Sequence, residues 1–188
     1  MSVGDTMKTS FYLISFSFLF LTLLYHSVTE AKDLGFRFKN GKCINPAGAE
    51  GVNPNYLGQC GSFKDAKVLG EKIIEKDLRG IQFEKTRIQN VLFDECDLSH
   101  SIFFKTKIVD SDFSYSQMKS ALIQEVRIFG SKFNSVQGEG LAIESSKIKN
   151  SEFINSKFEQ LTLSQSIIVD SNVSETDLRQ SKIEFSTF

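Results

Sequence analysis

Large apolar side chains recur at every fifth residue through most of this 188-residue chain. From Phe63 to Phe188 each fifth position is Phe, Leu, Ile, Val or Met, with Gly138 as the one exception among 26. A helix repeats its apolar positions at about 3.6 residues and a strand at 2. A sustained period of five fits neither, so it indicates a repeat architecture in which each unit is one short segment of a stacked core.

The units also repeat in groups of four. Residues twenty apart should share one environment, and therefore one shape, if four units form a coil. Two columns at this spacing are nearly pure: Ile88, Ile108, Ile128, Ile148 and Ile168, and then Phe93, Phe113, Phe133 and Phe153, followed by Val173. Three or five units per coil would not align these residues, so the sequence favours a twenty-residue coil.

A second set of positions, two residues before each large apolar residue, is usually small from residue 96 onward. These residues are Cys96, Ser101, Thr106, Ser111, Ser116, Ala121, Ser131, Ser146, Ser151, Ser156, Ser166, Ser171, Thr176, Ser181 and Ser186. The alternation predicts that small and large side chains both point inward and fill the core together.

Units such as CDLSH, SDFSY, SEFIN, SKFEQ and TDLRQ resemble those of the pentapeptide repeat family, over residues 76–188, or 60% of the chain. The resemblance implies an all-β fold, a right-handed quadrilateral β-helix with four units per coil. It also implies that the central residue and the small residue before it fill the interior.

Gly138 has two interpretations. It removes one side chain from the core, and its neighbours twenty residues away are Met118 and Phe158, which could lean into the gap. Alternatively, the segment VQGEG, residues 136–140, forms a local bulge, because glycine in a strand often marks distorted backbone.

One column contains residues that tolerate turn conformations: Asn90, Asp110, Gly130, Asn150 and Asp170. We interpret it as a corner of the coil. A metal site is the alternative for the two aspartates, but three coils separate them by about 14 Å at a strand spacing of about 4.8 Å. They cannot share an ion, so the turn interpretation is favoured.

The small-residue rule fails before residue 80, where Glu71 and Lys76 occupy those positions. We therefore predict that residues 61–75 form an N-terminal cap, as a short amphipathic helix that lays Val68, Leu69, Ile73 and Ile74 on the first coil.

Residues 11–25, FYLISFSFLFLTLLY, carry no charge. Fifteen helical residues rise about 22 Å, less than a hydrocarbon core of about 30 Å, so a signal peptide is favoured over a membrane span. Lys8 precedes the segment, and Thr29 and Ala31 occupy the small positions of a cleavage site. The sequence predicts a signal peptide at 1–31, with an uncleaved anchor as the alternative.

Residues 32–60 are rich in Gly, Pro and Asn and contain Cys43 and Cys60. In an exported chain these two would form a disulfide that closes the segment; two free thiols are the alternative. Cys96 lies within the repeats, where a small buried thiol is expected.

Charge and chemistry exclude several functions. Without residues 1–31 the chain has 21 basic and 21 acidic side chains, which supports no nucleic-acid partner. His100 is then the single histidine, so zinc or histidine-based catalysis lacks its groups. The carboxylates Asp94, Glu95 and Asp97 are expected to face water. We predict no enzyme activity, cofactor or metal; a site in the 44–56 loop would have no evident mechanism.

Some apolar residues stand where exposure is expected. Ile102, Leu122 and Ala142 are twenty apart on one wall, and Val109, Phe129 and Val169 align on the next. Aligned apolar residues form a patch, which either the N-terminal arm or a partner protein would cover. Near the C-terminal end, Ile183, Phe185 and Phe188 predict that two copies pair through their last coils.

The leading functional hypothesis is an exported bacterial solenoid, periplasmic or extracellular, that offers a rigid protein-binding surface without catalysis or membrane contact after cleavage. The alternative is a DNA mimic that inhibits a topoisomerase such as gyrase, as the resemblance implies. That alternative calls for a strongly acidic rod inside the cell, which a net charge of zero and a signal peptide do not favour.

Overall fold

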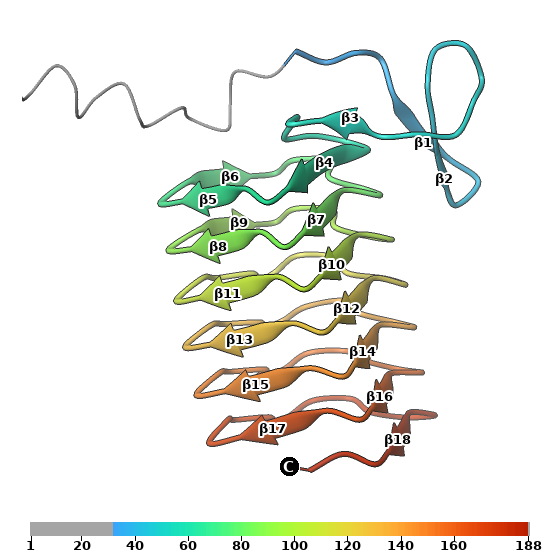
Figure 1. Cartoon of the computed structure of the whole chain (residues 1–188). Coiled ribbons are helices and arrows are strands. Elements are labelled where there is room, and N and C mark those ends of the chain that lie inside the picture. The colour runs from blue at the N-terminus through green and yellow to red at the C-terminus, as the bar shows by residue number, and fades with distance from the viewer. Residues whose placement is uncertain (1–31, 188) are drawn as a thin grey trace, which may run out of the picture.

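The computed structural model describes residues 32–187; the predicted signal peptide and Phe188 lie outside this range. Every regular element in it is a β-strand. Figure 1 shows the strands stacked as a four-sided solenoid of about six coils, with a small hairpin beside its N-terminal end. The fold is a pentapeptide-repeat β-helix, as predicted.

Two of the four walls are continuous parallel sheets. The first wall contains β3 (Asn53–Pro54), β4 (Gly61–Lys64), β7 (Gln82–Glu84), β10 (Ile102–Phe104), β12 (Leu122–Gln124), β14 (Ala142–Glu144), β16 (Thr162–Ser164) and β18 (Lys182–Glu184). The second wall contains β5 (Lys67–Leu69), β8 (Arg87–Gln89), β11 (Lys107–Val109), β13 (Arg127–Phe129), β15 (Lys147–Lys149) and β17 (Ile167–Val169).

The other two walls are paired more sparsely. The third wall begins with β6 (Lys72–Ile74) and β9 (Leu92–Asp94) and continues through single bridges at residues 112, 132, 152 and 172. The fourth wall is held by bridges alone, at residues 77, 97, 117, 137, 157 and 177. Between consecutive coils of the repeat every pairing joins residues twenty apart, which confirms the predicted coil length.

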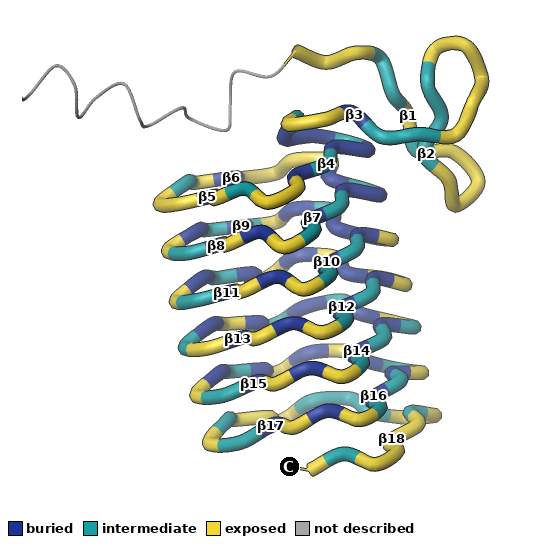
Figure 2. The backbone as a smooth tube through the Cα atoms, viewed as in Figure 1, coloured by how far each residue is buried: buried dark blue, intermediate teal, exposed yellow. Residues whose placement is uncertain are grey.

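The core consists of the predicted columns (Figure 2). The Ile and Phe columns from Ile88 to Ile168 are all buried. Phe93, Phe113, Phe133 and Phe153 stack in parallel with ring centroids 4.6, 4.9 and 5.0 Å apart. Stacked aromatic pairs add to the stabilisation that comes from the burial of each ring.

Buried serines bridge the coils in a way that size alone did not predict. The Oγ of Ser116 accepts a hydrogen bond from the backbone N–H of Cys96, at 3.2 Å, and donates to the Phe93 carbonyl, at 2.7 Å. The N–H of Val91 likewise donates to the Oγ of Ser111. A small residue with a hydroxyl therefore satisfies backbone groups that these corners leave without a strand partner.

The corners confirm the turn interpretation and extend it. The column from Asn90 to Asp170 has positive φ throughout, between 49° and 62°. Positive φ also occurs at all the remaining positions of this five-residue series, from Asn55 to Phe185. Non-glycine residues such as Tyr115 adopt it, although it is unfavourable for them, because stacking on both sides fixes the coil path.

At Gly138 the structure decides between the two interpretations. A Cβ added there would lie 2.5 Å from Cδ1 of Phe158, so this ring occupies the missing volume. Gln137 still bridges to Gln117 and Lys157, so no bulge interrupts the ladder.

The predicted helical cap at 61–75 is wrong. These residues form β4, β5 and β6 and make the first coil, in which Val68 and Ile73 are buried in register. Leu69 and Ile74 project outward and are exposed. The second and third walls have no earlier coil above them, so long side chains such as Glu71 fit at positions that are closed farther along the solenoid.

Candidate interaction surfaces

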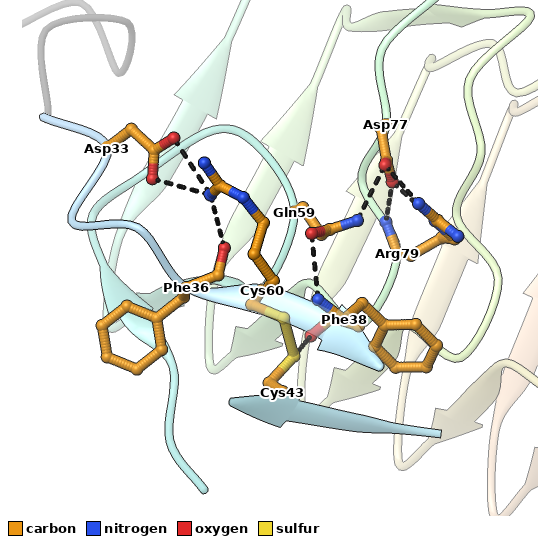
Figure 3. Close-up of a disulfide and its surroundings, with 10 residues drawn as sticks. Asp33, Phe36, Phe38, Cys43, Gln59, Cys60, Asp77 and Arg79 are labelled. Atoms are coloured by element: carbon orange, nitrogen blue, oxygen red, sulfur yellow. Dashed lines mark hydrogen bonds and ion pairs between the residues drawn. A yellow bond between two sulfur atoms is a disulfide. The ribbon is translucent and has the colours of Figure 1, made fainter. Parts of the chain in front are cut away.

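The N-terminal segment forms a disulfide-linked hairpin. Strands β1 (Arg37–Lys39) and β2 (Lys42–Ile44) pair antiparallel, and Cys43 on β2 is bonded to Cys60, with their Cα atoms 5.5 Å apart. Figure 3 shows this bond joining the hairpin to the start of the solenoid. The predicted disulfide is present and fixes the hairpin to the coil stack.

A chain of polar contacts positions the hairpin further (Figure 3). The N–H of Phe38 donates to Oε1 of Gln59 at 2.9 Å, and Nε2 of Gln59 donates to Oδ2 of Asp77 at 2.8 Å. The Arg79 guanidinium donates to both oxygens of Asp77. Hydrogen bonds from Arg79 hold the pKa of the Asp77 carboxyl below its usual range, so this acceptor stays charged at neutral pH.

Gly80 makes the close approach of the hairpin feasible. A Cβ at this position would lie 2.6 Å from the Cys43 sulfur and 2.7 Å from the Phe38 ring. The Phe38 ring also packs against His100, with ring centroids 5.0 Å apart. The hairpin therefore lies beside the first two coils.

A cleft of about 240 Å³ separates the hairpin from the first wall. Phe38 and Lys42 line its hairpin side, and Gln82, His100 and Ile102 line its wall side. The cleft thus combines aromatic, apolar and polar groups. No signal in the sequence placed the hairpin opposite His100, because the two are sixty residues apart.

The structure places the predicted apolar residues in the two expected columns. Ile102 and Leu122 are paired neighbours on β10 and β12 of the first wall, and both are half-buried. On the second wall Val169 is half-buried and Phe129 is 45% exposed. The hairpin faces Ile102 across the cleft, whereas Leu122 does not line the cleft, so the first-wall patch extends beyond the hairpin.

At the C-terminal end, the last described coil exposes apolar groups. Val173 and Ile183, in core columns, are 37% and 44% exposed, and Phe185 at a corner is 91% exposed. Phe188, which belonged to the predicted pairing surface, lies outside the described residues. Residues between 143 and 178, among them Phe153, Val173 and Leu178, line a small apolar hollow at this end.

The ionisable groups of residues 32–187 do not have the arrangement that a metal ion requires. Among residues 32–187 no three His, Cys, Asp or Glu side chains lie where they could hold a metal ion. Cys96 is buried, and burial raises the pKa of its thiol, which leaves it a protonated core residue. Residues 32–187 contain no apolar helix of membrane-spanning length.

Charge is sorted by wall, which the net charge of zero over residues 32–188 concealed. The second wall, with its corners, carries six basic and two acidic side chains: Lys67, Arg87, Lys107, Arg127, Lys147 and Lys149, against Asp110 and Asp170. The adjoining third wall carries seven acidic and two basic ones: Glu71, Glu75, Asp94, Glu95, Asp112, Glu152 and Glu175, against Lys72 and Lys132. Counting the charges separately for each set of positions twenty residues apart would have revealed this separation.

No protein-family model and no curated protein sequence matches the chain. Several solved structures are similar to it. QnrB1, a plasmid-mediated fluoroquinolone resistance protein, is 17% identical over 64% of this chain and 71% of its own, with a TM-score of 0.44. The pentapeptide repeat protein Rfr23 from the cyanobacterium Cyanothece 51142 is 12% identical over 68% and 90%, with a TM-score of 0.43. HetL, a pentapeptide repeat protein involved in heterocyst differentiation regulation in Nostoc sp. strain PCC 7120, is 14% identical over 68% and 67%, at 0.37.

Proposed function

We propose that this pentapeptide-repeat solenoid is a non-catalytic binding protein that holds a partner protein on its first wall, beside the hairpin. The observation that carries the proposal is the continuity between the cleft and the apolar column. Ile102 lines the cleft, and Leu122 and Ala142 extend the same column along the wall. A partner could insert a side chain beside Phe38 and lay an apolar surface over this column.

The rigidity of the site supports this function. The wall is a ladder of parallel strands, and the Cys43–Cys60 bond fixes the opposite side of the cleft. A preformed site loses little conformational entropy on binding. The disulfide also supports export, because such bonds persist in oxidising compartments.

Substitutions in one column test the proposal. Leu122→Asp places a charge in the centre of the patch, whereas Thr162→Asp introduces the same charge in the same column, two coils away. We expect a photo-crosslinker at Gln124 to trap one protein in wild type and in the Thr162 variant, and to trap none in the Leu122 variant. Equal crosslinking in all three would contradict the assigned surface.

Export has its own test. Cell fractionation should recover the protein outside the cytoplasm, with Lys32 as its first residue. Recovery in the cytoplasm with both cysteines reduced would refute export while leaving the binding surface untouched.

Pairing of two copies through their last coils is a second part of the proposal. Exposed Val173, Ile183 and Phe185 support it, since a second copy would cover them. Light scattering at micromolar concentration should show a dimer that Phe185→Asp dissociates and Phe129→Asp does not. A monomeric wild type would refute the pairing, and a dimer that only Phe129→Asp dissociates would move the interface to the second wall.

The alternative function, DNA mimicry, is favoured by one observation, the seven carboxylates of the third wall. The basic second wall beside it opposes the alternative, because a mimic of duplex DNA presents negative charge around its surface. Inhibition of DNA supercoiling by gyrase at micromolar protein, lost on neutralising Asp94 and Asp112, would establish mimicry over our proposal.

A further inference from the structure

The second wall carries an uninterrupted column of cations. Lys67, Arg87, Lys107, Arg127 and Lys147 stand directly opposite one another on β5, β8, β11, β13 and β15. These strands form one face of the stack in Figure 1. At a strand spacing of about 4.8 Å, the five charges form a single line about 19 Å long. The sixth position is Ile167, which ends the column.

The five side chains are exposed, and no carboxylate among residues 32–187 forms an ion pair with any of them. Other lysines of the same region do have acidic partners, such as Lys105 with Glu125 and Lys149 with Asp170. Like charges directly opposite one another destabilise a sheet. A column of this kind weakens the fold, which points to a role in binding.

We propose that the column binds a linear polyanion that runs along the solenoid axis, specifically an acidic polysaccharide with one carboxylate per sugar. Lysine offers a compact charge and arginine a bidentate donor pair for carboxylates, and the two alternate along the column. The acidic third wall repels a polyanion that spreads sideways around the adjoining corner. The chain is therefore confined to the direction of the column.

The neighbouring residues favour a polysaccharide. The parallel column on this wall is mostly uncharged: Leu69, Gln89, Val109, Phe129, Lys149 and Val169. Arg127 and Phe129 project from the same side of β13, about 6.6 Å apart along the strand. A sugar ring has an apolar C–H face and a carboxylate edge, so it can contact the 45% exposed Phe129 ring and Arg127 together.

The same features disfavour other polyanions. Single-stranded nucleic acids rely on several aromatic side chains on which bases stack, and Phe129 is the one aromatic residue that projects from the second-wall strands. Anionic membranes present a plane of headgroups, whereas five of the six basic side chains of this wall occupy one line. The proposal does not depend on the first-wall partner, because it uses a different wall and different residues.

The probe is polygalacturonate, with dextran as the uncharged control, titrated against residues 32–188 at several salt concentrations. Each phosphate contact to single-stranded nucleic acid contributes about −0.7 to the slope of log affinity against log salt, so five contacts to a comparable chain predict about −3.5. We expect polygalacturonate to bind with a slope near this value and dextran not to bind.

Two double variants distinguish an effect of the column from an effect of the protein's net charge. Lys107→Gln with Arg127→Gln removes two central cations, and we expect binding about tenfold weaker and a slope shallower by about 1.4. Lys132→Gln with Lys157→Gln removes the same charge from the third and fourth walls and should bind like wild type. The unfolding midpoint of the column variant should equal or exceed that of wild type, because a repulsion has been removed.

Three results would overturn the proposal. One is absence of binding to polygalacturonate at low salt. Another is an equal loss of affinity in both double variants, which would show that only net charge matters. The third is tighter binding of single-stranded DNA or of vesicles rich in anionic lipid, which would assign the column to a different class of partner. None of these results would affect the first-wall crosslinking experiment.

Discussion

Replacing Ser116 by alanine should destabilise the solenoid, whereas replacing Ser101 should not. Both serines are fully buried and occupy the same position of the repeat unit. The Ser116 hydroxyl accepts from the Cys96 N–H and donates to the Phe93 carbonyl, while the Ser101 hydroxyl has no hydrogen-bond partner in the described structure. The pair therefore compares a connected hydroxyl with an isolated one in closely similar surroundings.

The magnitudes follow from these contacts. Ser116→Ala leaves two buried backbone groups without a partner, each at a cost of about 1–3 kcal/mol, and partial relaxation gives an expected loss of about 2–3 kcal/mol. Ser101→Ala removes a buried hydroxyl that makes no hydrogen bond to offset its desolvation. We therefore expect the free energy of unfolding to stay the same or to rise by up to about 1 kcal/mol.

Equilibrium unfolding in urea measures both variants, and hydrogen exchange at the Cys96 amide locates the effect. Exchange at Cys96 should accelerate in the Ser116 variant and remain unchanged in the Ser101 variant. If both variants lost equal stability, volume rather than hydrogen bonding would explain why serine occupies these positions, and the reasoning would be refuted.

Three further predictions concern the core, the hairpin and the free thiol. Phe113→Ala should lower the free energy of unfolding in urea by about 3–5 kcal/mol, while Asp112→Ala on the outer surface should lower it by less than about 0.5 kcal/mol. Equal losses would contradict the assignment of Phe113 to the core and Asp112 to the surface. Gly80→Ala should accelerate reduction of the hairpin disulfide by dithiothreitol, because its Cβ would displace the hairpin. Gly140→Ala, with a similar φ and no contact closer than 3.5 Å, is the control, and equal rates would mean that Gly80 is not needed for docking. Cys96 should react with a thiol reagent only after denaturation; rapid labelling of the native protein would show that the coil opens there.

The sequence predicted those parts of the fold that depend on long-range periodicity. Residues twenty apart pair because each coil repeats the last, so the Ile88 and Phe93 columns revealed both the register and the core. The cap failed because Glu71 violates a rule that holds only where a coil lies on both sides. Most corners could not be predicted from local residue preferences. Tyr115, for example, has a positive φ that its own side chain does not favour, because stacking of the coils imposes it.

The candidate surfaces were predicted in part. Alignment at twenty residues placed Ile102 beside Leu122, but the position of the hairpin depends on close packing of Phe38 against Gly80, which no pattern within residues 32–60 encodes. The disulfide was predictable because its two cysteines bracket a segment too polar to form a core. Its docking site on the first two coils was not.

The same period that arranges the core also sorts the surface. In most folds, residues twenty apart have unrelated positions, and net charge summarises the surface as well as any simple quantity does. In a four-sided solenoid each outward position of the coil becomes a column, so charges that cancel in the total can still separate onto different walls. The cations from Lys67 to Lys147 lie in such a column, while the carboxylates gather around the next corner. For this architecture, a net charge near zero is compatible with a strongly basic wall, and a partner should be sought by comparing the columns.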